Sequence, residues 1–487
     1  MNATPSPRWR PGIALALFAA IAAGPSRLIA SPLQDADWTG KQVVVHPGAV
    51  KLHRLDGDGK VIEVGPVDFM VTLVEKDENG RLWMRWRGGN VFLDKGDVDL
   101  PEVAIQNATA AILLEPGRSS AWEYRGVARL ALSDVDAAIK DFDRAIELDP
   151  KRANHFFNRG LAWEKKQDND KAIADYTEAI RIDPGDSRSF AGRSFDRLNR
   201  SDFDDAIVDL SRVIDLEPND WVSFLFRGVA WREKQEYEKA IADFTAVIRI
   251  NPRDADAYYE RGLTWNEMND ADKAIADFTE AIKLDPKDAN PYDRRAEVWN
   301  RKRDYVQAIA DATKAIELAP AEAEGFRHRA FSWSRKHDYD QAIADYDSAI
   351  RLDPKSAILF ELRAEVWNWK KEFGKAIADC TEAVRINPKF AKAMNALAWL
   401  LATCSDAKLR DGVRAVALAQ NACELSSWKI PAYVGTLAAA HAECGHFDDA
   451  VKFQEQALAD PAYVKSYGGA AQKRLALYRA KQPFHDE

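Results

Sequence analysis

Two charged residue types recur along this sequence at a fixed spacing. Arginine stands at eight positions that are 34 residues apart, and an aspartate follows each arginine after 16 residues. The eight pairs are Arg125–Asp141, Arg159–Asp175, Arg193–Asp209, Arg227–Asp243, Arg261–Asp277, Arg295–Asp311, Arg329–Asp345 and Arg363–Asp379. A row of arginines could bind an anionic polymer. Because each arginine has its own aspartate, we favour a structural salt bridge.

Helical geometry supports this bridge. On two antiparallel helices with about 100° per residue, both side chains lie about 60° to the same side of the apolar stripe. Both members also disappear together, because Leu397 and Leu418 stand at the equivalent positions of a ninth repeat. The tenth repeat has Leu437 and Phe453 there. We therefore predict one Arg–Asp bridge per repeat, and together these bridges form a ladder.

The other reactive residues form no motif for catalysis or metal binding. None of the eight histidines belongs to an HExxH motif, and no Walker loop or GxSxG motif is present. Cys380, Cys404, Cys423 and Cys444 have spacings that match no metal knuckle, and their redox state stays open. We predict no catalytic residue, no cofactor and no metal, and we do not expect a small-molecule substrate.

The overall charge disfavours nucleic acid as a partner. The chain has 68 basic and 77 acidic residues, which give a net charge of −9. A protein that binds nucleic acid needs a basic face, and the charges of this chain are spread along its length. With 487 residues, the chain is also too long for one ordinary core.

Prolines reveal the elements that must position the charged pairs. Nine prolines are 34 residues apart: Pro116, Pro150, Pro184, Pro218, Pro252, Pro286, Pro320, Pro354 and Pro388. A period of this length indicates stacked supersecondary units. Counted from Ser119, eight full repeats cover residues 119–390, and each proline falls at repeat position 32.

Each repeat reads as two amphipathic helices. The first helix has apolar or small residues at repeat positions 4, 8 and 11, and the second has them at 20, 21, 24, 27 and 28. These spacings place the residues on one stripe of each helix. An acidic residue opens each second helix, where aspartate can cap the helix, and the proline ends it.

The pattern resembles that of the tetratricopeptide-repeat family. In the first repeat the matching residues are Trp122, Gly126, Ala138, Phe142, Ala145 and Pro150. The resemblance implies a mainly all-α fold, a right-handed superhelix of helix-turn-helix units (an α-solenoid) whose concave groove holds peptides. The chain departs from the family at repeat position 7, where arginine replaces the usual leucine. It also has tryptophan at position 11 in six repeats.

The ends of the array are irregular. Residues 102–118 read as a capping helix, 391–461 as two degenerate repeats, and 463–482 as a second capping helix. Such end units are expected, because the end faces of a solenoid must meet water.

The first hundred residues differ from the rest. Residues 1–30 have a positive start, a short apolar run and small residues, which predicts a signal peptide cleaved near Ala30 and an exported protein, periplasmic or extracellular. An uncleaved membrane anchor is the alternative. The mature chain has no other apolar run of membrane length. Residues 38–100 have strand composition and predict a small β barrel of about five strands, which resembles Src-homology-3-like domains.

Repeat positions 2, 5, 9 and 12 form a second stripe on the first helices, which we call the groove face. In the tetratricopeptide family this stripe lines the concave groove. Applied to this chain, the resemblance predicts these peptide-binding residues in the groove: Phe157, Leu161, Phe195, Leu225, Val229, Tyr259, Leu263, Asp293, Glu297, Arg327 and Phe331. The alternative is that the apolar members only fill contacts between neighbouring repeats.

These observations predict a non-enzymatic scaffold that binds protein or peptide partners in the groove. The alternative function is a protein that binds the cell envelope, or wall, through the β barrel, with the repeats as a spacer. The partner, the biological process and the oligomeric state stay open.

Overall fold

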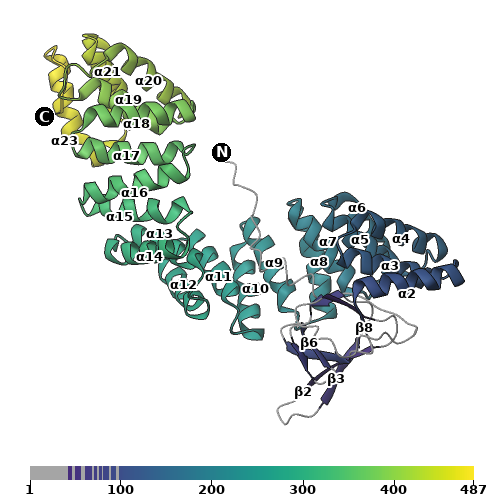
Figure 1. The fold of residues 1–487 in the computed structure, drawn as a ribbon. Helices are drawn as coiled ribbons and strands as arrows, with labels where there is room; N and C mark the ends of the chain where they lie inside the picture. Colours follow the sequence, from purple (N-terminus) through teal and green to yellow (C-terminus); the bar gives the residue numbers. More distant parts are fainter. Residues whose placement is uncertain are drawn as a thin grey trace. The chain divides into compact units, whose positions relative to one another are not determined.

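The computed structural model describes residues 42–45, 50–55, 61–67, 71–73, 76–78, 81–86, 89–94 and 98–486 (Figure 1). The predicted signal peptide and its cleavage site lie outside these residues. The chain divides into two compact bodies, one that ends at Thr264 and one that begins at Trp265.

The described part of residues 42–99 forms two antiparallel sheets. One sheet has the strand order β4-β1-β8 and the other β3-β2-β7-β6-β5. The strands are β1 (Gln42–Val45), β2 (Val50–Leu55), β3 (Val61–Val67), β4 (Val71–Leu73), β5 (Lys76–Glu78), β6 (Arg81–Trp86), β7 (Gly89–Asp94) and β8 (Val98–Asp99). The closed barrel and its Src-homology-3-like character remain predictions.

The strands touch the start of the helical array. Val44 of β1 is fully buried in a cluster with Ala104 and Tyr124. At the end of β8, the Asp99 carboxylate accepts hydrogen bonds from the Tyr124 hydroxyl and the Asn107 amide, both at 3.0 Å. Val44 and Asp99 therefore lie against α2 and the first repeat.

Residues 101–479 form 22 helices, the number that the sequence predicts. The first helices of the eight full repeats are α3 (Ser119–Ala131), α5 (Ala153–Lys165), α7 (Ser187–Asn199), α9 (Trp221–Glu233), α11 (Ala255–Glu267), α13 (Ala289–Arg301), α15 (Ala323–Arg335) and α17 (Ala357–Trp369). The second helices are α4 (Val135–Leu148), α6 (Asn169–Ile182), α8 (Phe203–Leu216), α10 (Tyr237–Ile250), α12 (Ala271–Leu284), α14 (Tyr305–Leu318), α16 (Tyr339–Leu352) and α18 (Phe373–Ile386).

Six further helices flank these repeats: α2 (Pro101–Leu114), α19 (Ala391–Thr403), α20 (Gly412–Leu425), α21 (Pro431–Glu443), α22 (Phe447–Leu458) and α23 (Pro461–Arg479). Helix α2 ends at Leu114, two residues before Pro116, and is thus shorter than the predicted segment. Helix α23 begins earlier and ends earlier than predicted. Lys481 has a positive φ of 57°, and Pro483 prevents the helix from continuing.

Short-range geometry explains the packing within a repeat. The glycine at repeat position 8 lets the aromatic ring at position 24 approach the first helix. A Cβ atom on Gly126 would lie 2.6 Å from the Phe142 ring, and one on Gly228 would lie 2.7 Å from the Phe244 ring. Both rings are fully buried. Aspartate caps also form, since Asp168, Asp270 and Asp304 accept from backbone N–H groups of the second helices.

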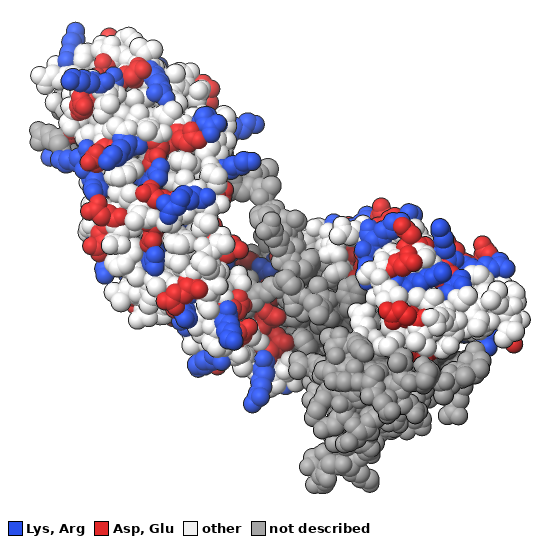
Figure 2. Space-filling model, in the orientation of Figure 1, with Lys and Arg blue, Asp and Glu red and all other residues white. Residues whose placement is uncertain are grey.

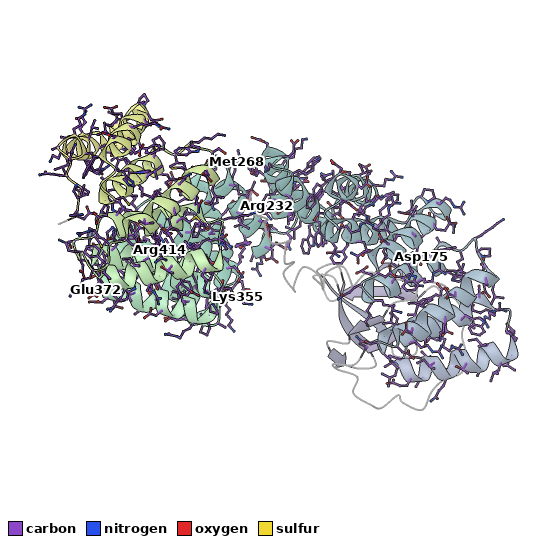
Figure 3. All side chains as sticks on the ribbon, turned by 90° about the horizontal axis from the view of Figure 1, so that it is seen from above. Asp175, Arg232, Met268, Lys355, Glu372 and Arg414 are labelled. Carbon is purple, nitrogen blue, oxygen red and sulfur yellow. The ribbon has the colours of Figure 1, made fainter. Side chains whose placement is uncertain are left out.

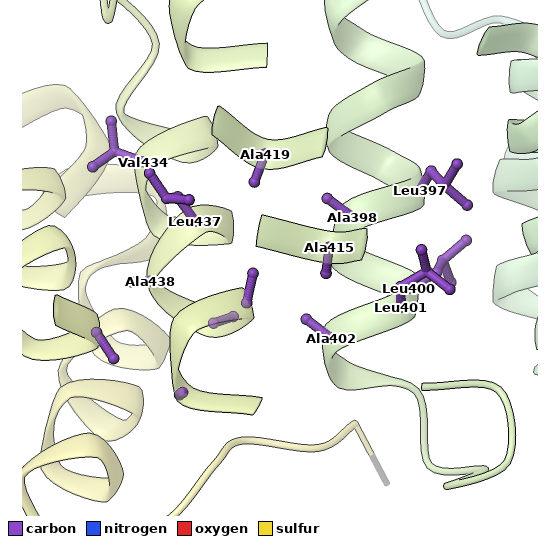
Figure 4. Packing of buried hydrophobic residues seen from close by; sticks show 14 of the residues in the cluster. Leu397, Ala398, Leu400, Leu401, Ala402, Ala415, Ala419, Val434, Leu437 and Ala438 are labelled. Carbon is purple, nitrogen blue, oxygen red and sulfur yellow. The ribbon is translucent and has the colours of Figure 1, made fainter. Parts of the chain in front are cut away.

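The ninth and tenth repeats pack differently from the others. Leu397, Leu401 and Leu437 are at most 3% exposed and lie in one apolar cluster with alanines of α19 to α22 (Figure 4). This cluster also takes in Tyr463 and Tyr478 of α23. The degenerate repeats and the last helix therefore share one continuous core.

Candidate protein-binding site

The structure places seven of the eight predicted Arg–Asp pairs in bidentate contact. In each pair the arginine Nε and Nη2 groups donate to the two aspartate oxygens at 2.6–3.0 Å. The aspartate side chains are at most 10% exposed and the arginines 12–22%. In the eighth pair, Arg261 and Asp277 belong to different bodies, and their bridge stays a prediction.

The arginines also connect neighbouring repeats. The third donor, Nη1, lies 2.5–3.3 Å from a side-chain oxygen of the preceding repeat. These acceptors stand at repeat position 25 or its equivalent in α2: Thr109, Asp143, Thr177, Ser211, Thr245, Thr279, Thr313 and Asp347. Our sequence reasoning missed this contact, although the 34-residue recurrence of Ser, Thr and Asp was a usable signal.

An aromatic ring covers each ladder arginine. The guanidinium carbon lies 4.8–6.0 Å from the ring centroid at repeat position 4, one turn earlier on the same helix. Arg159 is an example: its guanidinium carbon lies 5.8 Å from the Phe156 ring centroid, and its Nε donates to Asp175 at 2.8 Å. Figure 3 labels Asp175 among the side chains of the N-terminal body. Burial raises the pKa of the Asp175 carboxyl, while the hydrogen bonds from Arg159 act to lower it. The ladder is therefore enclosed by protein, which disfavours its use as a polymer-binding stripe.

Repeat position 11 also contributes to the ladder. Where the usual tryptophan is replaced, Arg129 and Arg197 donate to Asp141 and Asp209 at 2.7 and 2.6 Å. These two aspartates thus accept from two arginines each. In the repeats with tryptophan, a lysine such as Lys171 or Lys239 lies over the indole ring instead.

The groove-face residues fall into two groups. Phe157, Leu225, Val229 and Tyr259 are 1–7% exposed, as expected if they fill contacts between neighbouring helices. The half-buried members are those with surface left for a ligand: Leu161, Phe195 and Leu263 in the N-terminal body, and Asp293, Glu297, Arg327 and Phe331 in the C-terminal body. A sequence period places a residue on a face, but the neighbouring helices decide how much of it is covered.

A cavity of about 480 Å³ opens beside Phe195 in the N-terminal body. Its walls are Glu164, Gln167, Asn169, Phe195 and Asn199, from the end of α5, the start of α6 and the end of α7. One wall is an aromatic ring, and the others are a carboxylic acid and three amides. This lining matches a cationic group, which the carboxylate can pair with and the ring can cover.

A second carboxyl group belongs to Asp196, the residue that follows the cavity-wall residue Phe195 on α7. Asp196 is fully buried, and neither of its oxygens has a hydrogen-bond partner among the described residues. Burial and the charge of Glu164 raise the pKa of Asp196 to about 8. Burial likewise raises the pKa of Glu164 to about 7, although the Tyr176 hydroxyl donates to it at 2.9 Å. Asp196 stands at repeat position 10, which is not one of the groove-face positions, and sequence reasoning missed this pair.

The groove face of the C-terminal body carries a polar cluster. His328 Nδ1 lies 2.8 Å from Asp293, and its Nε2 lies 2.6 Å from the Arg327 guanidinium. Because arginine can only donate, His328 Nε2 accepts from Arg327, and Nδ1 carries the proton and donates a hydrogen bond to the Asp293 carboxylate. Burial acts to raise the pKa of Asp293, but the hydrogen bond from His328 and the charges of Arg294 and Arg327 lower it overall. The three side chains satisfy one another.

Acidic and basic side chains alternate over the visible surface of the described repeats (Figure 2). Within the described residues, no group of three or more His, Cys, Asp or Glu side chains is placed to hold a metal ion. All four cysteines are free thiols. No helix among the described residues is both long and apolar enough to cross a membrane.

Comparisons with known proteins agree with the repeat architecture. Tetratricopeptide-repeat family models match residues 88–153, 126–187, 228–265, 255–288 and 334–391. No curated protein matches the chain.

Several solved structures are similar to parts of the fold. A tetratricopeptide-repeat protein from Parabacteroides merdae is 18% identical, with 50% of this chain and 97% of that chain covered and a TM-score of 0.42. YrrB, a TPR protein with an unusual peptide-binding site, is 22% identical over 38% of this chain and 94% of its own, with a TM-score of 0.36. Yeast Tom70 is 17% identical over 78% of this chain and 92% of its own, with a TM-score of 0.39. The matching family models show that the helical array of this chain contains tetratricopeptide repeats.

Proposed function

We propose that this chain is a non-enzymatic scaffold that holds an extended segment of a partner protein against the groove face. The cavity beside Phe195 carries this proposal. Its wall includes the half-buried Phe195 of this face, and the half-buried Leu161 of the same face stands three residues before the wall residue Glu164 on α5. A bound segment could therefore bury apolar side chains and anchor one side chain in the cavity.

The chemistry of the cavity indicates which side chain the anchor is. Glu164 offers a carboxylate, and its charge acts on the buried Asp196 carboxyl, whose oxygens have no hydrogen-bond partner among the described residues. A lysine or arginine side chain of the partner would favour the ionised form of these acids and would lie against the Phe195 ring. We therefore propose that the partner segment has a basic residue flanked by apolar ones.

Selection from a random peptide library on the immobilised full chain tests this function. Enriched peptides should carry a lysine or arginine next to apolar residues. By calorimetry, Glu164→Gln and Phe195→Ser should each weaken their binding about tenfold, which corresponds to about 1.4 kcal/mol. Glu147→Gln, at an exposed position on α4, is the matched control. If all three variants bind like the unaltered chain, the groove proposal fails.

We further propose that the strand region caps the repeat array, as the contacts of Val44 and Asp99 favour. Wall binding through this region would be a separate activity. A sedimentation assay with purified cell walls distinguishes the two, because a chain that only uses its strands as a cap stays in the supernatant.

Export is also a proposal. Mass spectrometry of the protein from its native host should find a first residue near Ser31. An intact N-terminus in a membrane fraction would instead indicate the uncleaved anchor.

A further inference from the structure

The segment that follows α23 lies against the first helices of the last two repeats. We call residues Lys481–Asp486 the strap. Lys481 ends α23 with a positive φ, and Pro483 keeps the segment out of the helix. The strap then passes α21 and reaches the last turn of α19 (Figure 4). It thus joins residues of this body that are more than 80 positions apart in the sequence.

Three successive side chains of the strap make specific contacts. The Phe484 ring lies 6.1 Å from the Trp399 ring, and His485 Nε2 lies 2.7 Å from Glu443. The Asp486 carboxylate accepts a hydrogen bond from the Trp399 indole N–H at 3.1 Å. These contacts combine an aromatic ring, an imidazole and a carboxylate within three residues.

The backbone of the strap also contributes. The Asp486 N–H donates to the Thr403 carbonyl at 2.7 Å. Thr403 ends α19, so this carbonyl has no partner within its own helix. The Thr403 hydroxyl lies 3.2 Å from the Asp486 carboxylate, and it also donates to the Trp399 carbonyl at 2.8 Å.

The surface beneath the strap has the features of a binding site. The Arg474 guanidinium lies 5.2 Å from the Trp399 ring centroid and 5.7 Å from that of Phe484. Glu443 is held by Arg410, whose Nε donates to it at 2.8 Å. Trp399 stands at repeat position 9 of the ninth repeat, which is a groove-face position. The strap thus covers Trp399, a groove-face residue of the ninth repeat, with an aromatic contact and a hydrogen bond of the kind that a bound peptide would make.

We propose that the strap is an internal ligand, and that the surface formed by Trp399, Thr403, Glu443 and Arg474 is a peptide-binding site. The site takes a partner segment of the same chemistry, with a proline, an aromatic residue and, two positions later, a carboxylate. The covalent link holds the strap at a high effective concentration, so a partner must displace it before it binds. This site is separate from the cavity beside Phe195, and its test does not depend on that cavity.

A peptide-binding experiment tests the proposal on the full chain. The released variant carries Pro483→Gly, Phe484→Ser, His485→Gly and Asp486→Ser, which keep the chain length and remove the contacts. A fluorescent peptide of residues 479–486 should bind this variant at least tenfold more tightly than it binds the intact chain, as measured by anisotropy. A peptide with Phe484→Ala and Asp486→Asn is the matched control and should bind at least tenfold more weakly.

Two results would overturn the proposal. One is equal binding of the native and control peptides to the released variant. The other is no binding of either peptide to a released variant whose circular dichroism shows intact helices, which would make the strap a cap that acts only when covalently attached. If the released variant loses its helices, Phe484→Ala in the full chain replaces it, since this change keeps the backbone bond of Asp486. That variant should bind the native peptide more tightly than the intact chain does, and failure to do so counts against the proposal equally.

Discussion

The eight full repeats and the two degenerate repeats join their helices by different means. In residues 119–390 a bidentate Arg–Asp pair stands at the seam of the two helices in each of the seven repeats where the contact is described. In residues 391–461, Leu397 and Leu437 replace the arginine and are at most 1% exposed. The same backbone motif therefore tolerates a charged or an apolar contact at one position.

Comparison of the two regions indicates what the Arg–Asp contact contributes to the repeat array beyond what an apolar contact provides. A buried ion pair is often no more stabilising than apolar residues of similar volume, because both charges lose their hydration. Each arginine, however, also bonds to repeat position 25 of the preceding repeat, and this bond forms in one register of stacking. Arg414 of α20 provides a related contact to Thr381 at the start of the degenerate region. The apolar repeats gain cohesion from one shared cluster instead.

The largest expected effect comes from breaking one ladder pair. Asp311→Leu leaves the Arg295 guanidinium buried without its carboxylate, and we expect it to lower the free energy of unfolding by about 3 kcal/mol. The double variant Arg295→Leu/Asp311→Leu copies the ninth repeat and should recover at least half of that loss. Urea unfolding followed by circular dichroism measures both. Additive losses from the two single changes would rule out coupling, and Glu317→Gln on the same helix should change nothing.

A buried acid without an arginine gives the opposite prediction. Asp196→Ala introduces the alanine that repeats one, two and four have at repeat position 10. It should raise the free energy of unfolding by about 2 kcal/mol at pH 8, because it removes a buried carboxyl without a hydrogen-bond partner. The folded-state pKa of Asp196 is raised to about 8. The free-energy cost of ionising this buried carboxyl is therefore absent below about pH 4 and grows as the pH rises from about 4 to about 8. The gain should therefore vanish at pH 4. The control, Asp215→Ala at an exposed position of α8, should show no such pH dependence.

The contact between repeats can be weakened alone. Thr279→Val removes the hydroxyl that accepts from Arg295 Nη1 at 2.8 Å, and should cost about 1 kcal/mol. Thr279→Ser keeps the hydroxyl, as Ser211 does in an earlier repeat, and should cost less. Hydrogen exchange of the amides in α12 and α13 would locate the effect. A loss for serine as large as that for valine would show that the hydroxyl contact alone does not account for the effect.

The smallest effect concerns the turn between the two helices. In the eight full repeats, repeat position 15 has a φ of 60–66° without glycine, and the tenth repeat has Gly445 with a φ of 77°. Gly445→Ala meets open space, so the conformation of the backbone alone should cost about 0.5–1 kcal/mol. Ser133→Ala at the same turn of the first repeat should be neutral in thermal unfolding. A neutral Gly445→Ala would show that the turn relaxes.

The helices, the repeat boundaries and the ladder pairs could all be predicted from the sequence pattern. The 34-residue period shows which residues form the apolar stripes. Two helices joined by a short turn can pack in few ways, and this packing brings repeat positions 7 and 23 together. These are short-range properties, so a single repeat contains the information. The period did not show that position 15 needs a positive φ, because residues as different as Ser133, Arg303 and His337 stand there.

The tertiary structure decided which groove-face residues remain accessible and what lies against them. Phe157 and Leu225 share the stripe of Leu161 and Phe195, yet neighbouring helices bury the first two and leave the others half-buried. The strap contacts Trp399 across more than 80 residues, a separation at which no sequence period applies. Burial and long-range contact depend on how whole repeats stack. The sequence pattern of one repeat therefore places a side chain on a face of its helix but does not determine how far neighbouring helices bury it.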